Sequence, residues 1–151
     1  MTELDEIDRN LLRRLAQDAS QSAGALGRDL GLSQPATWRR IRRLETEGII
    51  KGRRLRLDVE KLGFGVTVFL GVKLALKGRV SLEDFERAVV AIPEVQTVEH
   101  VLGLYDYRLR VVARDLADFE RVLRRRIMTL PGAGDVEANV LLSEERLPGP
   151  L

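Results

Sequence analysis

The chain has 151 residues, 44% of them hydrophobic and none of them cysteine, so it is long enough for one folded domain or two small ones. This composition excludes a disulfide framework and a cysteine-based metal site, and no apolar run approaches the roughly 20 residues that span a bilayer. The net charge of +2 is uneven, because residues 1–58 carry 12 basic and 9 acidic side chains, and residues 59–151 carry 13 and 14. The N-terminus is acidic and lacks the parts of a signal peptide, so we expect a cytoplasmic protein with no membrane partner.

Two amphipathic helices are predicted at the start of the chain. Residues 4–18 carry leucine and isoleucine at helical spacing, with acidic side chains in the first turn and arginines later, as the helix macrodipole favours. After a short loop, residues 22–30 predict a second and shorter helix. Gly31 follows this helix, where a glycine in the left-handed conformation would end it.

The stretch from Gly31 to Glu45 organises this half of the chain, because it combines a turn, a capped start and a basic helix. Ser33 is a favourable N-cap, since its hydroxyl can accept from a backbone N–H of the first turn, and Pro35 lies where a missing N–H costs little. At about 100° per residue, one side of the helix carries an apolar stripe, which consists of Thr37, Trp38, Ile41 and Leu44. We therefore predict that Trp38 lies in the core and does not stack on a nucleobase.

The opposite side of the same helix is basic. Arg39 and Arg43 lie one turn apart on it, and eight basic residues against two acidic ones fall between Arg39 and Arg56. The major groove of DNA admits a helix of this kind, and local positive charge matters more for nucleic-acid binding than the net charge does. The alternative is a solvated basic face that binds nothing.

A hairpin-like wing is predicted over residues 49–58, because this stretch alternates at its end and carries Gly52 in the middle. Three helices followed by a basic hairpin describe a winged helix-turn-helix domain over residues 1–58, and its predicted partner is double-stranded DNA. Helix residues would meet bases or phosphates, and wing arginines, Arg56 included, would contact the DNA backbone. The predicted DNA-binding residues are Ser33, Gln34, Pro35, Ala36, Arg39, Arg40, Arg42, Arg43, Arg53 and Arg54.

A second domain is predicted over residues 65–151, after a connector at residues 59–64. Strands are expected at residues 65–76, 95–102, 107–113 and 136–142, and helices at residues 81–92, capped by Ser81, and 115–130, capped by Asp115. A similar hexapeptide stands at residues 82–87 and again at residues 116–121, 34 residues on, which indicates two tandem βαβ units. The predicted fold is α+β, a winged helix-turn-helix plus a ferredoxin-like βαββαβ sandwich. Two helices on one face of a sheet leave the other face bare, so we expect self-association.

Nothing in the sequence favours catalysis or metal binding. His100 is the only histidine, and without cysteine or a nucleophile–base pair we expect no metal, no cofactor and no enzymatic activity. The stretch from Gly103 to Tyr107 has two interpretations. It is a tight hairpin turn, or it is a loop that offers backbone N–H groups, a phenol and the carboxylate of Asp106 to an amino acid.

Several short motifs, taken in order, resemble the leucine-responsive/asparagine-synthase regulator (Lrp/AsnC) family of prokaryotic transcription factors. These motifs are Leu4–Asp8, Leu32-Ser33, Arg40–Glu45, Gly48–Gly52, Leu62-Gly63, Pro93–Val95, Gly103–Tyr107 and Leu130–Gly132. The ordered set is specific and covers nearly the whole chain. The resemblance implies a DNA-binding domain joined to a ligand-sensing domain that forms a homodimer, and in such proteins dimers often assemble into octamers.

The resemblance also implies an effector site, because amino acids bind such proteins between subunits near the glycine–aspartate turn. Carried over, this gives the effector-binding residues Leu102, Gly103, Tyr105 and Asp106. The chain departs from some relatives in its last strand, which reads Glu137-Ala138-Asn139 where they carry a hydroxyl residue. We predict a sequence-specific transcription regulator that an amino acid or a related small molecule modulates. The alternatives are an architectural DNA-binding protein without sequence preference or effector, and an enzyme on the same scaffold.

Overall fold

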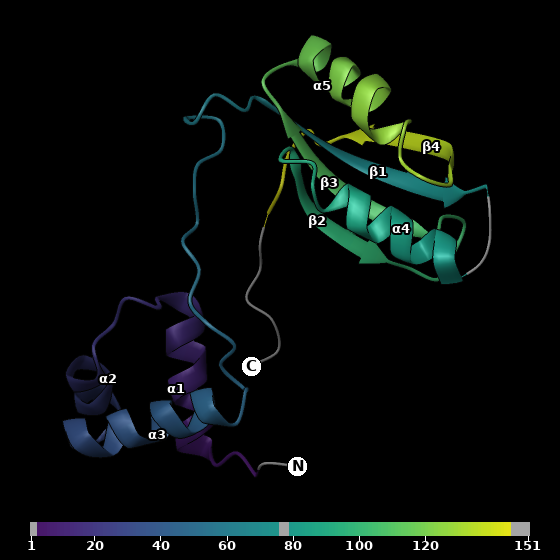
Figure 1. Ribbon diagram of the computed structural model, residues 1–151. Coiled ribbons are helices and arrows are strands. Elements are labelled where there is room, and N and C mark those ends of the chain that lie inside the picture. Colours follow the sequence, from purple (N-terminus) through teal and green to yellow (C-terminus); the bar gives the residue numbers. More distant parts are fainter. Residues whose placement is uncertain (1–2, 76–78, 146–151) are drawn as a thin grey trace. The chain divides into compact units, whose positions relative to one another are not determined.

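The computed structural model of the protein describes residues 3–75 and 79–145 (Figure 1). Its contacts divide the chain into two compact units, of which the first extends to Arg56 and the second comprises residues 57–144. The first unit contains α1 (Glu6–Gln17), α2 (Ala23–Leu30) and α3 (Gln34–Thr46). The second contains, in chain order, β1 (Val66–Leu74), α4 (Arg79–Val89), β2 (Val95–His100), β3 (Tyr107–Ala113), α5 (Leu116–Val122), η1 (Leu123–Ile127) and β4 (Ala133–Val140).

The helices of the first unit begin at capping residues. Asp5 caps α1 in a reciprocal capping box, because the Asp8 amide donates to Asp5 Oδ1 over 2.7 Å and the Asp5 amide donates to Asp8 Oδ2 over 3.3 Å. Ser22 and Ser33 cap α2 and α3 by accepting from backbone amides of the first turn. Gly31 has a φ of 68°, which confirms the predicted left-handed turn between α2 and α3.

The core of the first unit lies between its three helices. One leucine from each helix is fully buried, namely Leu11, Leu26 and Leu44. Trp38 is 55% exposed, so the prediction of a buried tryptophan is wrong. The buried residues of α3 follow the spacing i, i+4 and i+7 from Thr37, and Trp38 lies one residue, about 100°, to the side of that line.

No strand is present in residues 51–58, so the predicted hairpin-like wing is not formed there. The chain leaves α3 through Gly48, with a φ of 72°, and continues without regular secondary structure. An isolated two-stranded hairpin is marginal in water, and this stretch lacks the apolar face that would stabilise one, since Leu55 and Leu57 are exposed. The helix-turn-helix part of the prediction is confirmed, and the wing is not.

The second unit is the predicted ferredoxin-like arrangement. Its four strands form one antiparallel sheet in the order β2-β3-β1-β4. In β1, residues 68, 70, 72 and 74 are buried against α4 and α5, whereas the residues between them are only partly buried. The helices therefore cover one face of the sheet, and the second face consists of the alternate residues.

The internal repeat defines two equivalent helices. Phe85 of α4 and Phe119 of α5 occupy matching repeat positions and are both buried in the same core. α4 begins at Arg79, two residues before the predicted cap at Ser81. Asp115 caps α5 as predicted. The helix continues beyond α5 as η1, a π-helical turn that carries three consecutive arginines. No helix in residues 3–75 and 79–145 is long and apolar enough to cross a membrane.

Candidate DNA-binding helix and effector site

The start of α3 has the geometry that a recognition helix needs. The Ser33 hydroxyl accepts from the Ala36 amide over 3.3 Å, and Pro35 occupies a first-turn position without an amide to satisfy. Gln34 and Pro35 are exposed, and Ala36 is partly exposed. The predicted contact residues at this end therefore lie on the surface of one helix terminus, where free backbone amides favour an anion such as a phosphate.

Two of the predicted DNA-binding arginines contact a buried carboxylate of α1. Arg40 Nη1 lies 2.7 Å from Asp5 Oδ2 and 2.8 Å from Asp8 Oδ1, and Arg43 Nη2 donates to Asp8 Oδ2. The Asp8 side chain is 1% exposed, so this carboxylate is buried with both guanidiniums against it. Sequence reasoning missed this role because the partners lie more than 30 positions apart.

The ion pairs of this cluster shift the pKa values of Asp5 and Arg40. The Asp8 amide and the Arg40 guanidinium hold the pKa of Asp5 below its ordinary value of 3.8. Hydrogen bonds to the carboxylates of Asp5 and Asp8, of which Asp5 has the larger effect, raise the pKa of Arg40. These ion pairs tie α3 to the start of α1, which sets the angle at which α3 is presented.

Other residues of α3 face solvent. Arg39 is exposed, and no described side chain pairs with it. The Arg42 guanidinium lies 5.7 Å from the ring centroid of Trp38 and 3.1 Å from Glu45, and both Arg42 and Trp38 are exposed. An apolar ring and two cations on one open surface are suited to base edges, thymine methyl groups and phosphates.

The arginines beyond α3 lie in the stretch without regular structure. Arg53 Nη2 approaches Glu45 Oε1 at 4.0 Å, and its side chain is 50% exposed. Arg54 and Arg56 are exposed as well. These side chains carry positive charge without a rigid frame, which suits contacts to a DNA backbone better than readout of single bases.

The predicted effector residues lie in the turn between β2 and β3. Asp106 is a structural tie, because its carboxylate accepts from the Leu74 amide over 2.8 Å and its own amide donates to the Val72 carbonyl over 3.0 Å. Leu102 is fully exposed at the tip, and Gly103 is exposed as well. The hairpin interpretation of this stretch is confirmed, and its role in ligand binding stays a prediction.

Tyr105 folds from this turn over β1. Its hydroxyl donates to Glu137 Oε2, which raises the pKa of Tyr105 and lowers the pKa of Glu137. Gly71 is required beneath the ring, because a Cβ there would lie 2.5 Å from Tyr105 Cδ2. Glu137 pairs with Gly71 in the sheet register, so the residue that departs from some relatives lies beside a predicted effector residue.

A hollow of about 280 Å³ lies beside Tyr105. Its lining combines apolar and aromatic side chains with a few polar groups, as small-molecule sites do. It consists of Phe69, Leu70, Gly71, Val101, Leu104, Tyr105, Tyr107, Arg108 and Asn139. Of the predicted effector residues it includes only Tyr105, and the others reach the surface outside it.

His100 is exposed at the end of β2. Its ring stacks on Tyr107 with centroids 4.8 Å apart. In the part of the chain that the structure describes, no group of three or more histidine, aspartate or glutamate side chains is placed to hold a metal ion.

A capped recognition helix behind a glycine turn, joined to a ferredoxin-like unit, defines a helix-turn-helix regulator with a separate αβ domain. The family comparisons agree with this class. Residues 4–45 match the AsnC-type helix-turn-helix domain, and residues 67–148 match the Lrp/AsnC ligand binding domain. The chain belongs to the Lrp/AsnC family of transcriptional regulators.

Relatives match over nearly their whole length. The chain is 38% identical over 147 residues to the Bkd operon transcriptional regulator of Pseudomonas aeruginosa, covering 97% of this chain and 96% of that one. It is 32% identical to the leucine-responsive regulatory protein of Salmonella typhimurium, covering 94% and 87%. A solved transcriptional regulator of Neisseria meningitidis in complex with L-Met superposes with a TM-score of 0.91 at 26% identity, covering 99% and 96%.

Proposed function

We propose that this regulator reads DNA sequence through the surface of α3 on which Trp38, Arg39 and Arg42 stand. The observation that carries the proposal is that some arginines of α3 form ion pairs within the protein and others do not. Arg40 and Arg43 are engaged with Asp8, whereas Arg39 is exposed and has no partner among the described residues. An unpartnered guanidinium can make a bidentate contact with guanine without giving up an internal ion pair.

The other predicted contacts would position α3 on the duplex. Ser33, Gln34, Pro35 and Ala36 lie at the helix start, where amides suit a phosphate. Arg40 and Arg43 would contribute positive potential while they hold α3 against α1. Arg53 and Arg54 would contact backbone phosphates and confer salt dependence rather than sequence choice.

We further propose that an amino acid is the effector and that it binds near the turn at residues 102–106. A relative of the same fold is described in complex with L-Met, and another is named for its response to leucine. Asp106 Oδ2 accepts from the Leu74 amide, and within the described residues Oδ1 accepts no hydrogen bond. That second oxygen is available to an ammonium group, and Leu102 and Gly103 would supply a wall and a backbone contact.

Self-association would complete this site. The sheet face away from α4 and α5 carries the partly buried Phe69, and the exposed Val101 and Leu104 line the hollow beside it. A second copy of the chain would cover them, so we propose a homodimer, and an octamer as its further assembly. We also propose that the protein acts in the cytoplasm and has no catalytic activity, in keeping with its family of regulators.

The direct test compares DNA binding by the wild-type protein with Arg39→Ala and Lys51→Ala. Duplexes would first be selected from a random pool by the wild-type protein. Arg39→Ala is expected to weaken binding of the selected duplex by about 1–3 kcal/mol and to leave binding of random duplexes nearly unchanged. Equal weakening on every duplex would make Arg39 a phosphate contact. Lys51→Ala is the matched control for loss of one nearby positive charge.

The effector is tested by light scattering of the whole protein with a panel of single amino acids at fixed salt. One amino acid is expected to change the mass of the assembly, and Asp106→Asn is expected to abolish that change. If no amino acid alters either the mass or the thermal unfolding, the effector part of the proposal is wrong. The Arg39 experiment would still decide the DNA-binding part.

A further inference from the structure

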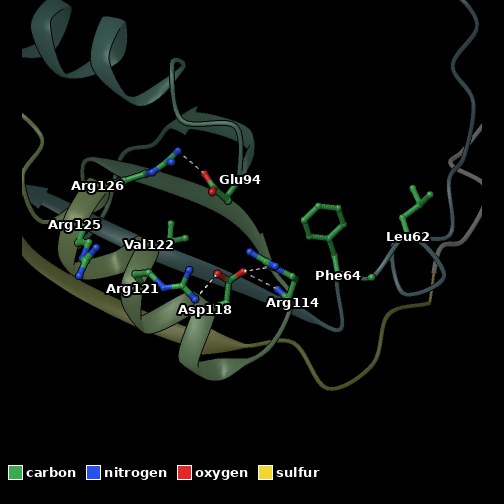
Figure 2. Close-up of a pocket in the computed structure, with 10 residues that line it drawn as sticks. Leu62, Phe64, Glu94, Arg114, Asp118, Arg121, Val122, Arg125 and Arg126 are labelled. Carbon is green, nitrogen blue, oxygen red and sulfur yellow. Dashed lines mark hydrogen bonds and ion pairs between the residues drawn. The ribbon is translucent and has the colours of Figure 1, made fainter.

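A second cavity lies in the αβ unit, away from the turn at residues 102–106. Its volume is about 490 Å³, and Figure 2 shows it between the connector before β1, the residue that precedes β2 and the outer side of α5 and η1. Its lining is notable for arginine, and comprises Leu62, Gly63, Phe64, Glu94, Arg114, Asp118, Arg121, Val122, Arg125 and Arg126. Four cations thus face two carboxylates.

Both carboxylates of the cavity are already engaged. Glu94 Oε2 lies 3.0 Å from Arg126 Nη1 on one side of the opening. On the other side, Asp118 Oδ1 lies 3.0 Å from Arg121 Nη2, and Asp118 Oδ2 accepts from the Arg114 amide over 3.1 Å. These contacts, the amide first, hold the pKa of Asp118 below its ordinary value, so the carboxylate is ionised at neutral pH. The dashed lines of Figure 2 follow these two groups.

The other three arginines of the lining pair with Asp118 or Glu94, and Arg125 does not. It stands in the π-helical turn η1, at the end of the cavity opposite Phe64 in Figure 2. No described carboxylate pairs with it, whereas its neighbour Arg124 points to Glu120 Oε1 at 2.6 Å and does not line the cavity. A π turn displaces the following side chains around the helix axis, and such turns are frequent at functional sites.

The floor and one end of the cavity are apolar. Val122 is buried beneath the arginines, and the Phe64 ring is half-buried at the connector end. The Gly65 amide donates to the Arg114 carbonyl over 3.3 Å, which holds the connector against the wall of the cavity. A ligand seated here would therefore touch both the connector and α5.

We propose that this cavity binds a small phosphate-bearing metabolite that also carries a planar or apolar group. The phosphate lies against Arg125 with support from Arg121, because guanidinium forks match phosphate oxygens in geometry and charge. The planar group lies over Val122 and against Phe64. The volume is within the range of small-molecule sites.

A small ligand fits these observations better than a DNA backbone does. A duplex presents a convex row of phosphates to a surface, whereas this site is a cavity. Glu94 and Asp118 also lie within its lining, and carboxylates there would repel a continuous line of phosphates while leaving room for one. The lining contains none of the predicted effector residues and none of the residues of α3.

The test is titration calorimetry of the full chain, without DNA, at constant ionic strength. The probes are inorganic pyrophosphate, which offers the anion alone, and ADP, which adds a planar base. Both are expected to bind, and Arg125→Gln is expected to weaken both by about tenfold or more, as the loss of one charge-assisted contact implies. Arg124→Gln removes the same charge from the same turn outside the cavity and is expected to change neither.

The connector end is tested with Phe64→Leu. This variant is expected to weaken ADP binding several-fold and to leave pyrophosphate binding unchanged, which also shows that the site is still folded. Absence of binding by both probes would overturn the proposal, as would equal weakening by Arg124→Gln and Arg125→Gln. If neither probe binds and Arg125→Gln instead weakens binding of random duplex DNA, the arginines are a DNA contact and the small-ligand proposal is wrong.

Discussion

The two units of this protein contain the same pair of aspartates at a helix start, but the contacts of these aspartates differ. Each has a helix with aspartate at the N-cap and aspartate three residues later, Asp5 and Asp8 in α1 and Asp115 and Asp118 in α5. In both, the second aspartate is buried and meets two arginines. The first pair of arginines comes from α3, and the second from positions 114 and 121, close in sequence to Asp118 itself.

This difference decides what each cluster does. The contacts of Asp8 join two helices across the core of the first unit, so they fix how α3 is held. The contacts of Asp118 are made with the residues four positions before it and three positions after it, and they fix only the local shape of a cavity wall. Identical residue types at identical spacing therefore stabilise tertiary packing in one place and line a site in the other.

Among the charged residues, the largest expected effect is the loss of Asp8. Asp8→Asn leaves two guanidiniums beside a buried group that no longer neutralises them, and the free energy of unfolding of the first unit is expected to fall by about 2–3 kcal/mol. The one tryptophan of the chain lies in α3, so urea unfolding followed by its fluorescence reports on this unit. Asp118→Asn is the matched control and is expected to leave that transition unchanged.

A second comparison separates the arginines of α3 from one another. Arg43→Ala removes a contact with Asp8 from a side chain that is 42% exposed, and we expect a loss of about 1 kcal/mol in the same unfolding experiment. Arg39→Ala is expected to change stability by less than about 0.5 kcal/mol, because its side chain faces solvent. Equal losses for the two variants would contradict the assignment of Arg43 to the ion-pair cluster.

The loss of stability at low pH tests the contribution of Asp5, which lies at the edge of the ion-pair cluster around Asp8. The pKa of Asp5 is lower in the folded protein than its ordinary value of 3.8. A depressed carboxyl pKa contributes stability that is present above pH 3.8 and is lost as the pH falls through the folded pKa. Asp5→Asn is therefore expected to flatten the loss of tryptophan-detected stability below that pH. An acid limb identical to that of the wild-type protein would show that Asp5 contributes nothing to it.

Trp38 is expected to contribute little to the stability of the first unit. Because its side chain is 55% exposed, Trp38→Ala is expected to change the free energy of unfolding by less than about 1 kcal/mol, measured by circular dichroism. Ile41→Ala, one turn further along the apolar stripe, is expected to cost about 3 kcal/mol. A cost for Trp38→Ala as large as that for Ile41→Ala would place the tryptophan in the core after all.

Much of the fold follows from local chemistry, and the sequence by itself determined it. Serine before an apolar stripe, glycine after one, and a repeated hexapeptide located the three helices, the turn between α2 and α3 and the βαββαβ order, because capping and periodicity act within a few residues. The turn at Asp106 was located in the same way. The hydrogen bond from the Leu74 amide to the Asp106 carboxylate was not, because these residues are 32 positions apart.

Only the tertiary structure decided what the charged and aromatic side chains do. Whether an arginine of α3 is free depends on how close α1 brings Asp8, and whether Trp38 is buried depends on which line of α3 the other helices cover. The prediction of a hairpin-like wing was wrong because it also depended on tertiary contacts. Alternation in the sequence stabilises a strand only when a partner strand and an apolar face are present. The cavity of arginines was invisible in the sequence, because its walls come from the connector, the start of β2 and the π turn, which only folding brings together.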